Sequence, residues 1–252
     1  MARVIALAGK GGTGKTTVAG LLVRALQQDG QGPVLAVDAD PNSCLDVAIG
    51  LAADRTVSDV LDESRGLRDV PGNMPKPTYV EMQLEDCLAE GRGVDLIVMG
   101  RPEGQECYCS ANQMLRTFMD RMIGSYPTVV VDNEAGMEHL SRRTTRDIDL
   151  LLVVSDATLA GARATRRIAD LVGELELPVK HLAVVVDGAE ELAEPVADIL
   201  TGDGLDVAGF VPHDPLIVEQ ELQAAPLLDL PDDAPAVRAV EGLLARELRG
   251  AV

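Results

Sequence analysis

The chain has 252 residues, of which 46% are hydrophobic, so it holds enough apolar side chains for a globular core. Its 41 Asp and Glu outnumber its 22 Lys and Arg, which gives a formal net charge of −19 at pH 7. This charge disfavours general binding to nucleic acid or to anionic lipid, and three Tyr and two Phe are too few for base stacking. We therefore expect no nucleic-acid or membrane partner, and one α/β domain over residues 1–252.

Cysteine use and the first residues indicate the cellular compartment. Four Cys in a chain of this length do not make a disulfide framework, and no apolar stretch is long enough to span a bilayer. The segment Met1–Ala8 runs directly into Gly9 without the pattern of a signal peptide. We expect a cytoplasmic protein with reduced thiols.

Seven short apolar runs follow one another along the chain, with helical stretches between them. The runs are β-branched and continuous rather than alternating, as in strands that are buried on both faces of a parallel sheet. Between the first two runs, apolar residues recur at helical spacing over residues 18–26. The alternation predicts an α/β fold with a doubly wound, mostly parallel sheet and helices on both faces. The runs are Val4–Ala8, Val34–Val37, Leu96–Met99, Val129–Val131, Leu150–Val154, Leu182–Val186 and Val207–Val211.

Three other stretches complete the predicted elements. Gly66–Pro77 has turn-forming Pro residues and little periodicity, so we expect a loop. Residues 187–206 are rich in Asp and Glu, as on a solvated helical face. The last helix, Pro235–Arg249, has no aromatic residue and is predicted to pack against the core through Val237, Val240, Leu244 and Leu248.

A glycine-rich loop follows the first predicted strand and opens the first helix. Residues 9–16 fit the G-x-x-x-x-G-K-[ST] pattern of a phosphate-binding loop, which makes the chain a P-loop NTPase candidate. Backbone N–H groups of such a loop converge on phosphate oxygens, Lys15 reaches the β- and γ-phosphates, and Thr16 holds Mg²⁺. The expected nucleotide-binding residues are Gly11, Gly12, Thr13, Gly14, Lys15, Thr16 and Thr17.

A second lysine, Lys10, stands at the start of this loop, although the chain has only four Lys in all. The loop resembles the deviant Walker A motif of the MinD/ParA class of P-loop ATPases. The resemblance implies a homodimer that forms on ATP binding, in which Lys10 crosses to the partner's nucleotide and is catalytic. A solvated loop lysine is the alternative. A cation supplied in this way neutralises charge on the transferring phosphoryl group.

Carboxylates follow two of the predicted strands, where ligands of parallel sheets bind. Asp38 and Asp40 follow the second run, and Asp132 follows the fourth run as in a Walker B motif. The resemblance to the MinD/ParA class implies that Asp38 and Asp132 lie near Mg²⁺ and that Asp40 orients the attacking water. It also places Gly136 near the γ-phosphate. An Asp after an apolar run is otherwise a helix cap.

Cys107 and Cys109 lie between a buried strand and an amphipathic helix, just before the helix N-terminus. This position favours the thiolate form, which binds metal. Two thiolates cannot complete a tetrahedral site, but a two-fold dimer supplies 2 × 2 = 4 of them. Two small buried Cys are the alternative interpretation.

Three strings in the sequence are similar to the CooC type of ATPase, which supports nickel insertion into carbon monoxide dehydrogenase. They are Met99–Gly104, Cys107–Cys109 and Asp132–Arg143. The resemblance covers the chain from Gly9 to about Asp214 and implies a shared Ni²⁺ or Zn²⁺ site on Cys107 and Cys109 and a client metalloenzyme. Cys44 and Cys87 are isolated and are interpreted as packing residues. His139 and His181 are interpreted as ordinary surface or core residues.

One position departs from the MinD/ParA pattern. The class places an Asn that reads adenine after the Leu182–Val186 strand, whereas this chain has Asp187. An ionised carboxylate only accepts hydrogen bonds, which suits guanine better than adenine. The other motifs favour ATP, so the base is predicted as adenine with GTP left open. Pro212 and Asp214 resemble the segment that packs against the base.

Two other functions stay open at this point. The first is a positioning or partition ATPase that acts as a switch without a metal site. The second is a reductase-like electron donor with an iron–sulfur cluster bridging a dimer, although such proteins take their Cys from separate segments.

Overall fold

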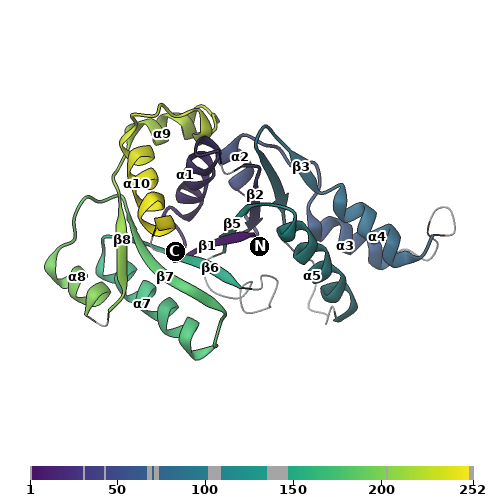
Figure 1. The fold of residues 1–252 in the computed structure, drawn as a ribbon, viewed down its shortest axis with the longest axis horizontal. Coiled ribbons are helices and arrows are strands. Elements are labelled where there is room, and N and C mark those ends of the chain that lie inside the picture. Colours follow the sequence, from purple (N-terminus) through teal and green to yellow (C-terminus); the bar gives the residue numbers. More distant parts are fainter. Residues whose placement is uncertain are drawn as a thin grey trace.

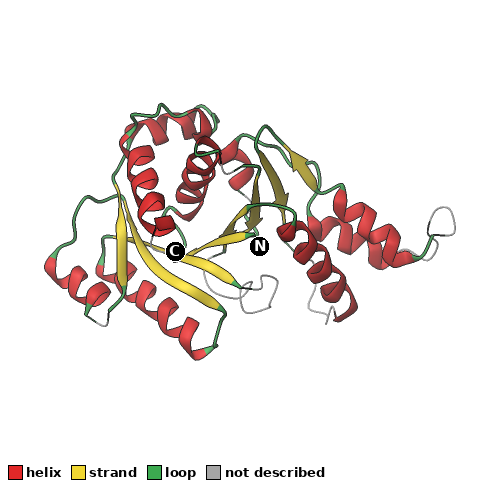
Figure 2. Ribbon diagram, in the orientation of Figure 1, coloured by secondary structure: helices red, strands yellow, loops and turns green. Residues whose placement is uncertain are grey.

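The strands form one eight-stranded sheet in the order β3-β4-β2-β5-β1-β6-β7-β8 (Figures 1 and 2). The computed structural model describes residues 2–30, 32–42, 44–66, 70, 74–101, 109–134, 147–202 and 204–249. All neighbouring strands are parallel except β3 and β4, which are antiparallel. The strands are β1 (Arg3–Gly9), β2 (Val34–Ala39), β3 (Leu88–Glu90), β4 (Val94–Val98), β5 (Thr128–Asn133), β6 (Ile148–Asp156), β7 (Val179–Asp187) and β8 (Asp206–Val211).

The doubly wound, mostly parallel sheet predicted from the sequence is confirmed, and each of the seven apolar runs is a strand. The strand that the sequence did not reveal is β3. It has three residues, none of them buried, and it pairs with β4 at the edge of the sheet. An edge strand this short carries no apolar run, because it has no second neighbour and little buried surface.

Helices cover both faces of the sheet because successive strand residues point to opposite sides. In β1, Ile5 and Leu7 join one core, whereas Val4, Ala6 and Ala8 join the other. The first core packs against α1 (Lys15–Gln28), α2 (Leu45–Ile49), the short helix η2 (Leu227–Asp229) and α10 (Pro235–Arg249). The second packs against α3 (Val57–Gly66), α4 (Lys76–Glu85), α5 (Cys109–Gly124) and α7 (Leu159–Glu174).

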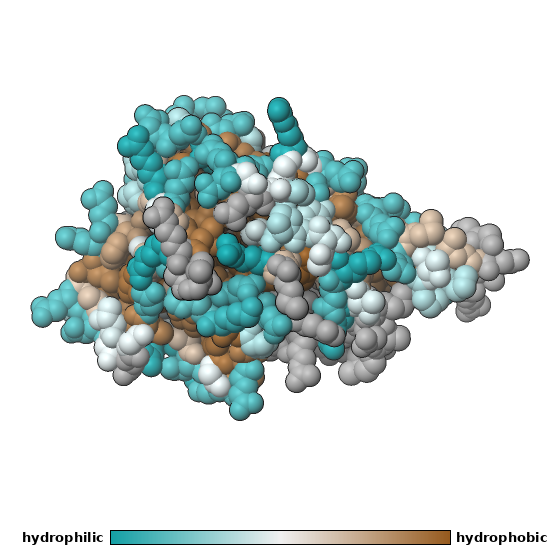
Figure 3. Space-filling model, in the orientation of Figure 1, coloured by the Kyte–Doolittle hydropathy of each residue, from teal (hydrophilic) through white to brown (hydrophobic). Residues whose placement is uncertain are grey.

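The last helix has the predicted bounds, Pro235–Arg249. Val237, Val240 and Leu244 are buried against the first core, and Leu248 is partly buried beside them. The packing role expected for this helix is therefore confirmed. Among the helices that the structure describes, none is long and apolar enough to cross a membrane. The remaining helices are α8 (Glu194–Thr201) and α9 (Pro215–Leu222). Figure 3 shows mainly hydrophilic residues along the top of this face, where α9 lies, although α9 has no buried residue and leaves Val218 and Leu222 exposed.

Two predicted boundaries are wrong. The loop expected over Gly66–Pro77 is shorter than predicted, because α3 ends at Gly66 and α4 begins at Lys76. Pro77 lies in the first turn of α4, where its missing N–H removes no helical hydrogen bond. In the acidic stretch 187–206, only α8 is helical, and the stretch also contains the ends of β7 and β8.

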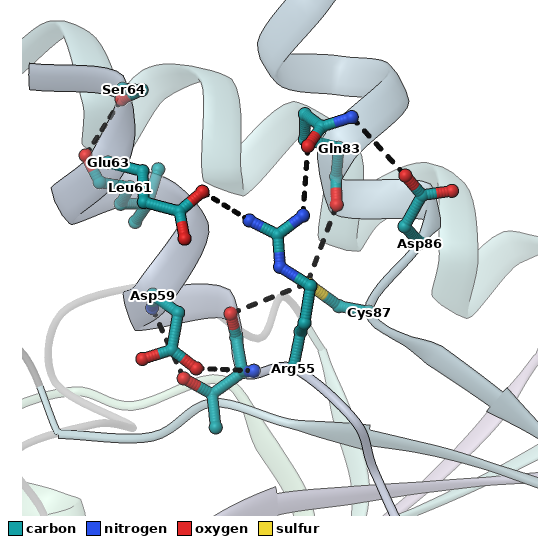
Figure 4. Close-up of polar contacts among 9 residues, drawn as sticks. Arg55, Asp59, Leu61, Glu63, Ser64, Gln83, Asp86 and Cys87 are labelled. Carbon is teal, nitrogen blue, oxygen red and sulfur yellow. Dashed lines mark hydrogen bonds and ion pairs between the residues drawn. The ribbon is translucent and has the colours of Figure 1, made fainter.

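A polar network fixes α3 against α4 at one end of the molecule (Figure 4). The guanidinium of Arg55 forms an ion pair with Glu63 of α3 and donates a 2.8 Å hydrogen bond to Gln83 of α4. The buried Cys87 thiol donates to the backbone oxygen of Thr56 at 3.4 Å, so its predicted packing role is confirmed. Arg121 then joins α5 to α4 through Glu81 and Glu85. These contacts position the helix that begins at Cys109.

Candidate nucleotide site

The glycine-rich loop connects β1 to α1 through a backbone that only glycine adopts easily. Gly14 precedes α1 in the left-handed region, with φ +81°. A Cβ at Gly14 would lie 2.2 Å from Oδ2 of Asp187, so a larger residue would meet that carboxyl group. The expected phosphate-binding loop therefore has a left-handed backbone at Gly14 and lies close to Asp187 at the end of β7.

The two loop lysines lie in different surroundings. Lys15 is 7% exposed, and its ammonium donates to the backbone oxygen of Lys10 at 3.2 Å. The Thr13 hydroxyl donates to the same oxygen at 2.9 Å. The side chain of Lys10 is exposed. Lys15 is thus held inside the loop, while the Lys10 side chain is open to solvent.

Sheet register brings the predicted carboxylates together. Asp38 of β2 lies directly opposite Asp132 of β5, and both are almost fully buried. Thr16 at the start of α1 donates to Oδ2 of Asp132 at 2.6 Å. The other oxygen, Oδ1 of Asp132, is buried and has no hydrogen-bond partner within the described part of the chain. Buried carboxylate oxygens normally have hydrogen-bond partners, so this oxygen is suited to serve as a ligand of a small divalent cation.

Burial raises the pKa of both carboxyl groups. The pKa of Asp38 rises to about 6, mainly by desolvation, although N–H groups of Leu45 and Asp40 oppose the rise. The pKa of Asp132 rises to about 7, also by desolvation, with the Thr16 hydrogen bond opposing it and the charge of Asp38 adding to it. Two adjacent carboxylates that resist ionisation are stabilised by a cation between them, so the electrostatics favour Mg²⁺ here.

Asp40 is half-buried and shapes the segment after β2. Its Oδ1 accepts hydrogen bonds from the backbone N–H of Asn42 at 2.8 Å and from the Asn42 side chain at 2.9 Å. These contacts hold the carboxyl group on the loop next to Asp38. The structure therefore brings together Lys15, Thr16, Asp38 and Asp132, with Asp40 on the adjoining loop.

The two residues predicted to lie near the base have different surroundings. Asp187 ends β7 beside Gly14, and burial raises its pKa. Asp214 is buried, and its two oxygens accept from the N–H groups of Leu216 at 3.0 Å and Ala236 at 3.1 Å. Asp214 thus caps α9 and also holds the start of α10, and its place in the segment beside the base stays a prediction. Pro212 is half-buried in the segment after β8.

The predicted thiolate pair lies largely outside the described residues. Cys107 is not described, and Cys109 is the first residue of α5 rather than a residue before it, with its side chain not described. Gly136 and His139 also lie outside the described residues. The amphipathic helix expected after the pair is confirmed, because Leu115 and Phe118 are buried in the second core.

Two further residues near the candidate site have roles that the sequence did not indicate. Cys44 is exposed immediately before α2, so the packing role predicted for it is wrong. The first helical residue, Leu45, turns into the core instead. Partial desolvation, followed by the nearby negative charge of Asp38, raises the pKa of the Cys44 thiol. Asn133, which belongs to the Asp132–Arg143 string, donates from Nδ2 to the Leu7 backbone oxygen at 2.8 Å and ties β5 to β1.

Comparison with known proteins places this arrangement in a family. Residues 4–227 match the model of the CobQ/CobB/MinD/ParA nucleotide-binding domain. The chain belongs to this family. An ATP-binding protein of Methanocaldococcus jannaschii is 40% identical over 242 residues, which cover 94% of this chain and 95% of the relative. The family match covers most of the chain and agrees with the P-loop architecture that the sequence predicted.

Two further similarities bear on function and fold. The carbon monoxide dehydrogenase accessory protein CooC of Rhodospirillum rubrum is 31% identical over 251 residues, covering 93% of this chain and 91% of that protein. The cell division ATPase MinD of Pyrococcus furiosus superimposes with a TM-score of 0.72 over the full length of both chains, at 20% identity. The second similarity concerns the fold alone.

Proposed function

We propose that this protein is a Mg²⁺-dependent ATPase that acts as a metallochaperone. ATP closes a homodimer, and hydrolysis is coupled to nickel insertion into carbon monoxide dehydrogenase or a related metalloenzyme. The observation that supports the ATPase most strongly is the contact of Thr16 with Asp132, beside a buried carboxylate oxygen for which the described residues offer no partner. The CxC pair and the 31% identity to CooC support the metal function.

Each part of the site has a role in this proposal. Backbone N–H groups of residues 11–17 bind the phosphates, and Lys15 exchanges its contact with the Lys10 oxygen for the β- and γ-phosphates. Thr16, Asp38 and Asp132 hold Mg²⁺. When bound, Mg²⁺ neutralises charge that develops on the phosphate oxygens.

Residues outside the buried site complete the reaction. Asp40 lies on the loop after β2 and orients the attacking water. Lys10 is exposed, which suits a lysine that contacts the nucleotide of the partner subunit in the closed dimer. ATP is the proposed nucleotide, and Asp187, Pro212 and Asp214 belong to the region where its base binds.

The metal site is proposed to form only in the dimer. Cys107 and Cys109 of both subunits supply four thiolates, the number that Ni²⁺ or Zn²⁺ takes in a closed sulfur site. Closing or opening the dimer changes the distance between the two pairs. Metal affinity is therefore coupled to the nucleotide state.

Thiolate-to-metal absorption tests this proposal. We expect Ni²⁺ or Co²⁺ to give a sulfur charge-transfer band with one metal per dimer, and expect a non-hydrolysable ATP analogue to change its affinity. Cys107→Ser removes the band, whereas the control Cys44→Ser, at an exposed cysteine outside the CxC pair, keeps it. A protein that shows no such band with or without nucleotide has no CxC metal site.

A positioning or partition switch without a metal is the alternative, and its support is the structural similarity to MinD. Co-sedimentation with anionic vesicles and with DNA separates the two functions. ATP-dependent co-sedimentation together with no thiolate–metal band favours the switch. Absorption of visible light by the protein as purified would instead indicate the electron donor with an iron–sulfur cluster.

A further inference from the structure

A second group of metal-binding side chains lies at the opposite edge of the sheet from the nucleotide site. His181 comes from the first half of β7, Asp206 begins β8, and Glu247 lies near the end of α10. Asp187, which contacts the phosphate loop, is six residues further along β7 than His181, or about 20 Å in an extended strand.

The distances among these side chains match those between ligands of one metal ion. Nε2 of His181 lies 2.9 Å from Oε2 of Glu247 and 3.7 Å from Oδ2 of Asp206. One ligand atom from each of the three residues lies within 4.8 Å of the other two. Ligands about 2.0–2.1 Å from a zinc ion and about 90–110° apart are about 2.9–3.4 Å from each other. Only a small movement of Asp206 is needed to reach that spacing.

The guanidinium of Arg246 orients both carboxylates without occupying the oxygens that face His181. It contacts Oδ1 of Asp206 and, at 3.5 Å, Oε1 of Glu247. The same guanidinium donates to the backbone oxygens of Val207 at 2.9 Å and Ala208 at 2.8 Å, so it is itself fixed. Metal ligands in proteins are commonly oriented by polar contacts to their outer atoms.

Burial and an adjoining cavity complete the site. The Glu247 side chain is only 4% exposed, whereas His181 is 47% exposed, so the group joins a buried carboxylate to an accessible imidazole. A cavity of about 600 Å³ opens on all three residues and is also lined by Arg3, Asp149 and Lys180. It has room for the water molecules or the small anion that would complete the coordination of a metal with three protein ligands.

We propose that His181, Asp206 and Glu247 bind a divalent first-row transition metal, Zn²⁺ or Ni²⁺, separately from the CxC pair. One imidazole and two carboxylates suit these ions, and the imidazole disfavours Mg²⁺. The ion joins β7, β8 and α10 and keeps open positions toward the cavity. This site does not depend on the metallochaperone function, because it uses no residue of the CxC pair or of the nucleotide site.

The experiment uses the full chain with Cys107→Ser and Cys109→Ser, so that the thiolate pair cannot contribute. Zn²⁺ is titrated against a chelating dye, and imidazole proton signals are followed by NMR. The chain has only three His, which makes each signal assignable by substitution. We expect one Zn²⁺ per chain and a shift of the His181 signal alone.

Substitutions in this background identify the ligands. We expect His181→Asn and Asp206→Asn each to weaken Zn²⁺ binding at least about tenfold. Asp206 is partly exposed, so its variant guards against a folding defect. Glu241→Gln is the matched control, because it removes a carboxylate from the same helix, where Glu241 instead pairs with Arg24 at 3.5 Å.

Three results would overturn the proposal. They are no Zn²⁺ binding in the Cys-to-Ser protein, unchanged affinity in His181→Asn, and a shift of the His139 or His213 signal instead of the His181 signal. In each case the group is an ion-pair network that holds α10 to the sheet. A failed thiolate–metal band would leave this result unaffected, so the two proposals fail separately.

Discussion

Replacing Asp132 by Asn tests whether the candidate Mg²⁺ site stores electrostatic strain. Asp132 is 1% exposed, and one of its oxygens has no hydrogen-bond partner within the described residues. An amide has nearly the same shape, can still accept from Thr16, and carries no charge. We expect Asp132→Asn to stabilise the nucleotide-free protein at pH 8 while removing Mg²⁺-dependent nucleotide binding.

The raised pKa of Asp132 sets the magnitude. The pKa rises from 3.8 to about 7, and each pKa unit corresponds to about 1.4 kcal/mol. Ionising this carboxyl group in the folded state therefore costs about 4 kcal/mol. The folded state holds the proton more tightly than the unfolded state, so the wild-type protein loses this stability as the pH rises from about 4 to about 7. The advantage of Asp132→Asn is near zero at pH 4 and largest at pH 8.

Urea unfolding of both proteins without nucleotide or Mg²⁺, at several pH values between 4 and 8, measures this advantage. Asp29→Asn is the control, since Asp29 is exposed at the end of α1 and should change the free energy of unfolding by no more than about 0.5 kcal/mol. If Asp132→Asn is less stable than wild type at pH 8, or if its advantage does not grow with pH, the strained-carboxylate account is refuted.

Three other substitutions test the site and its support. Gly14→Ala should abolish nucleotide binding and destabilise the fold by about 1–3 kcal/mol. The control Gly30→Ala, at a similar φ of +69° with open space around it, should keep nucleotide binding. Equal losses of binding in the two variants would show that the contact with Asp187 is unimportant. Asp187→Asn should shift the ratio of ATP to GTP affinity toward ATP by about tenfold, measured by titration with both nucleotides, because an amide can also donate; an unchanged ratio would place the base elsewhere. Arg24→Met should lower the free energy of unfolding by about 2–3 kcal/mol, because the buried guanidinium donates to Asp232 and to the Leu230 backbone oxygen. Arg238 is exposed, so Arg238→Met should leave the free energy of unfolding unchanged in the same assay.

Much of the fold and the centre of the candidate nucleotide site could be predicted from the sequence, because the patterns that indicate them are local. Apolar runs buried on both faces indicate parallel strands, and a glycine-rich turn between a strand and a helix indicates phosphate binding. Asp38 and Asp132 could be found from their positions at the ends of such runs. That they lie directly opposite each other follows from the register of β2 and β5, which periodicity does not contain.

Other residues received their roles only from packing. Asp214 matches a motif, yet its two oxygens are used by backbone N–H groups of Leu216 and Ala236, one of which lies 22 residues away. Cys44 stands next to an apolar helix, but the first turn of α2 leaves it exposed and buries Leu45. Neither outcome is visible in the local sequence, because side-chain partners depend on where distant segments meet.

Local patterns in the sequence were enough to predict the alternating strands and helices, the candidate phosphate loop and the carboxylates at the strand ends, since each is a pattern over a few consecutive residues. Which side chains lie together depends on the tertiary fold. His181, Asp206 and Glu247 are separated by 25 and 41 residues, and they approach one another because β7 and β8 are neighbours and α10 ends beside them. Packing of the two cores against the sheet creates this proximity, and no single segment encodes it.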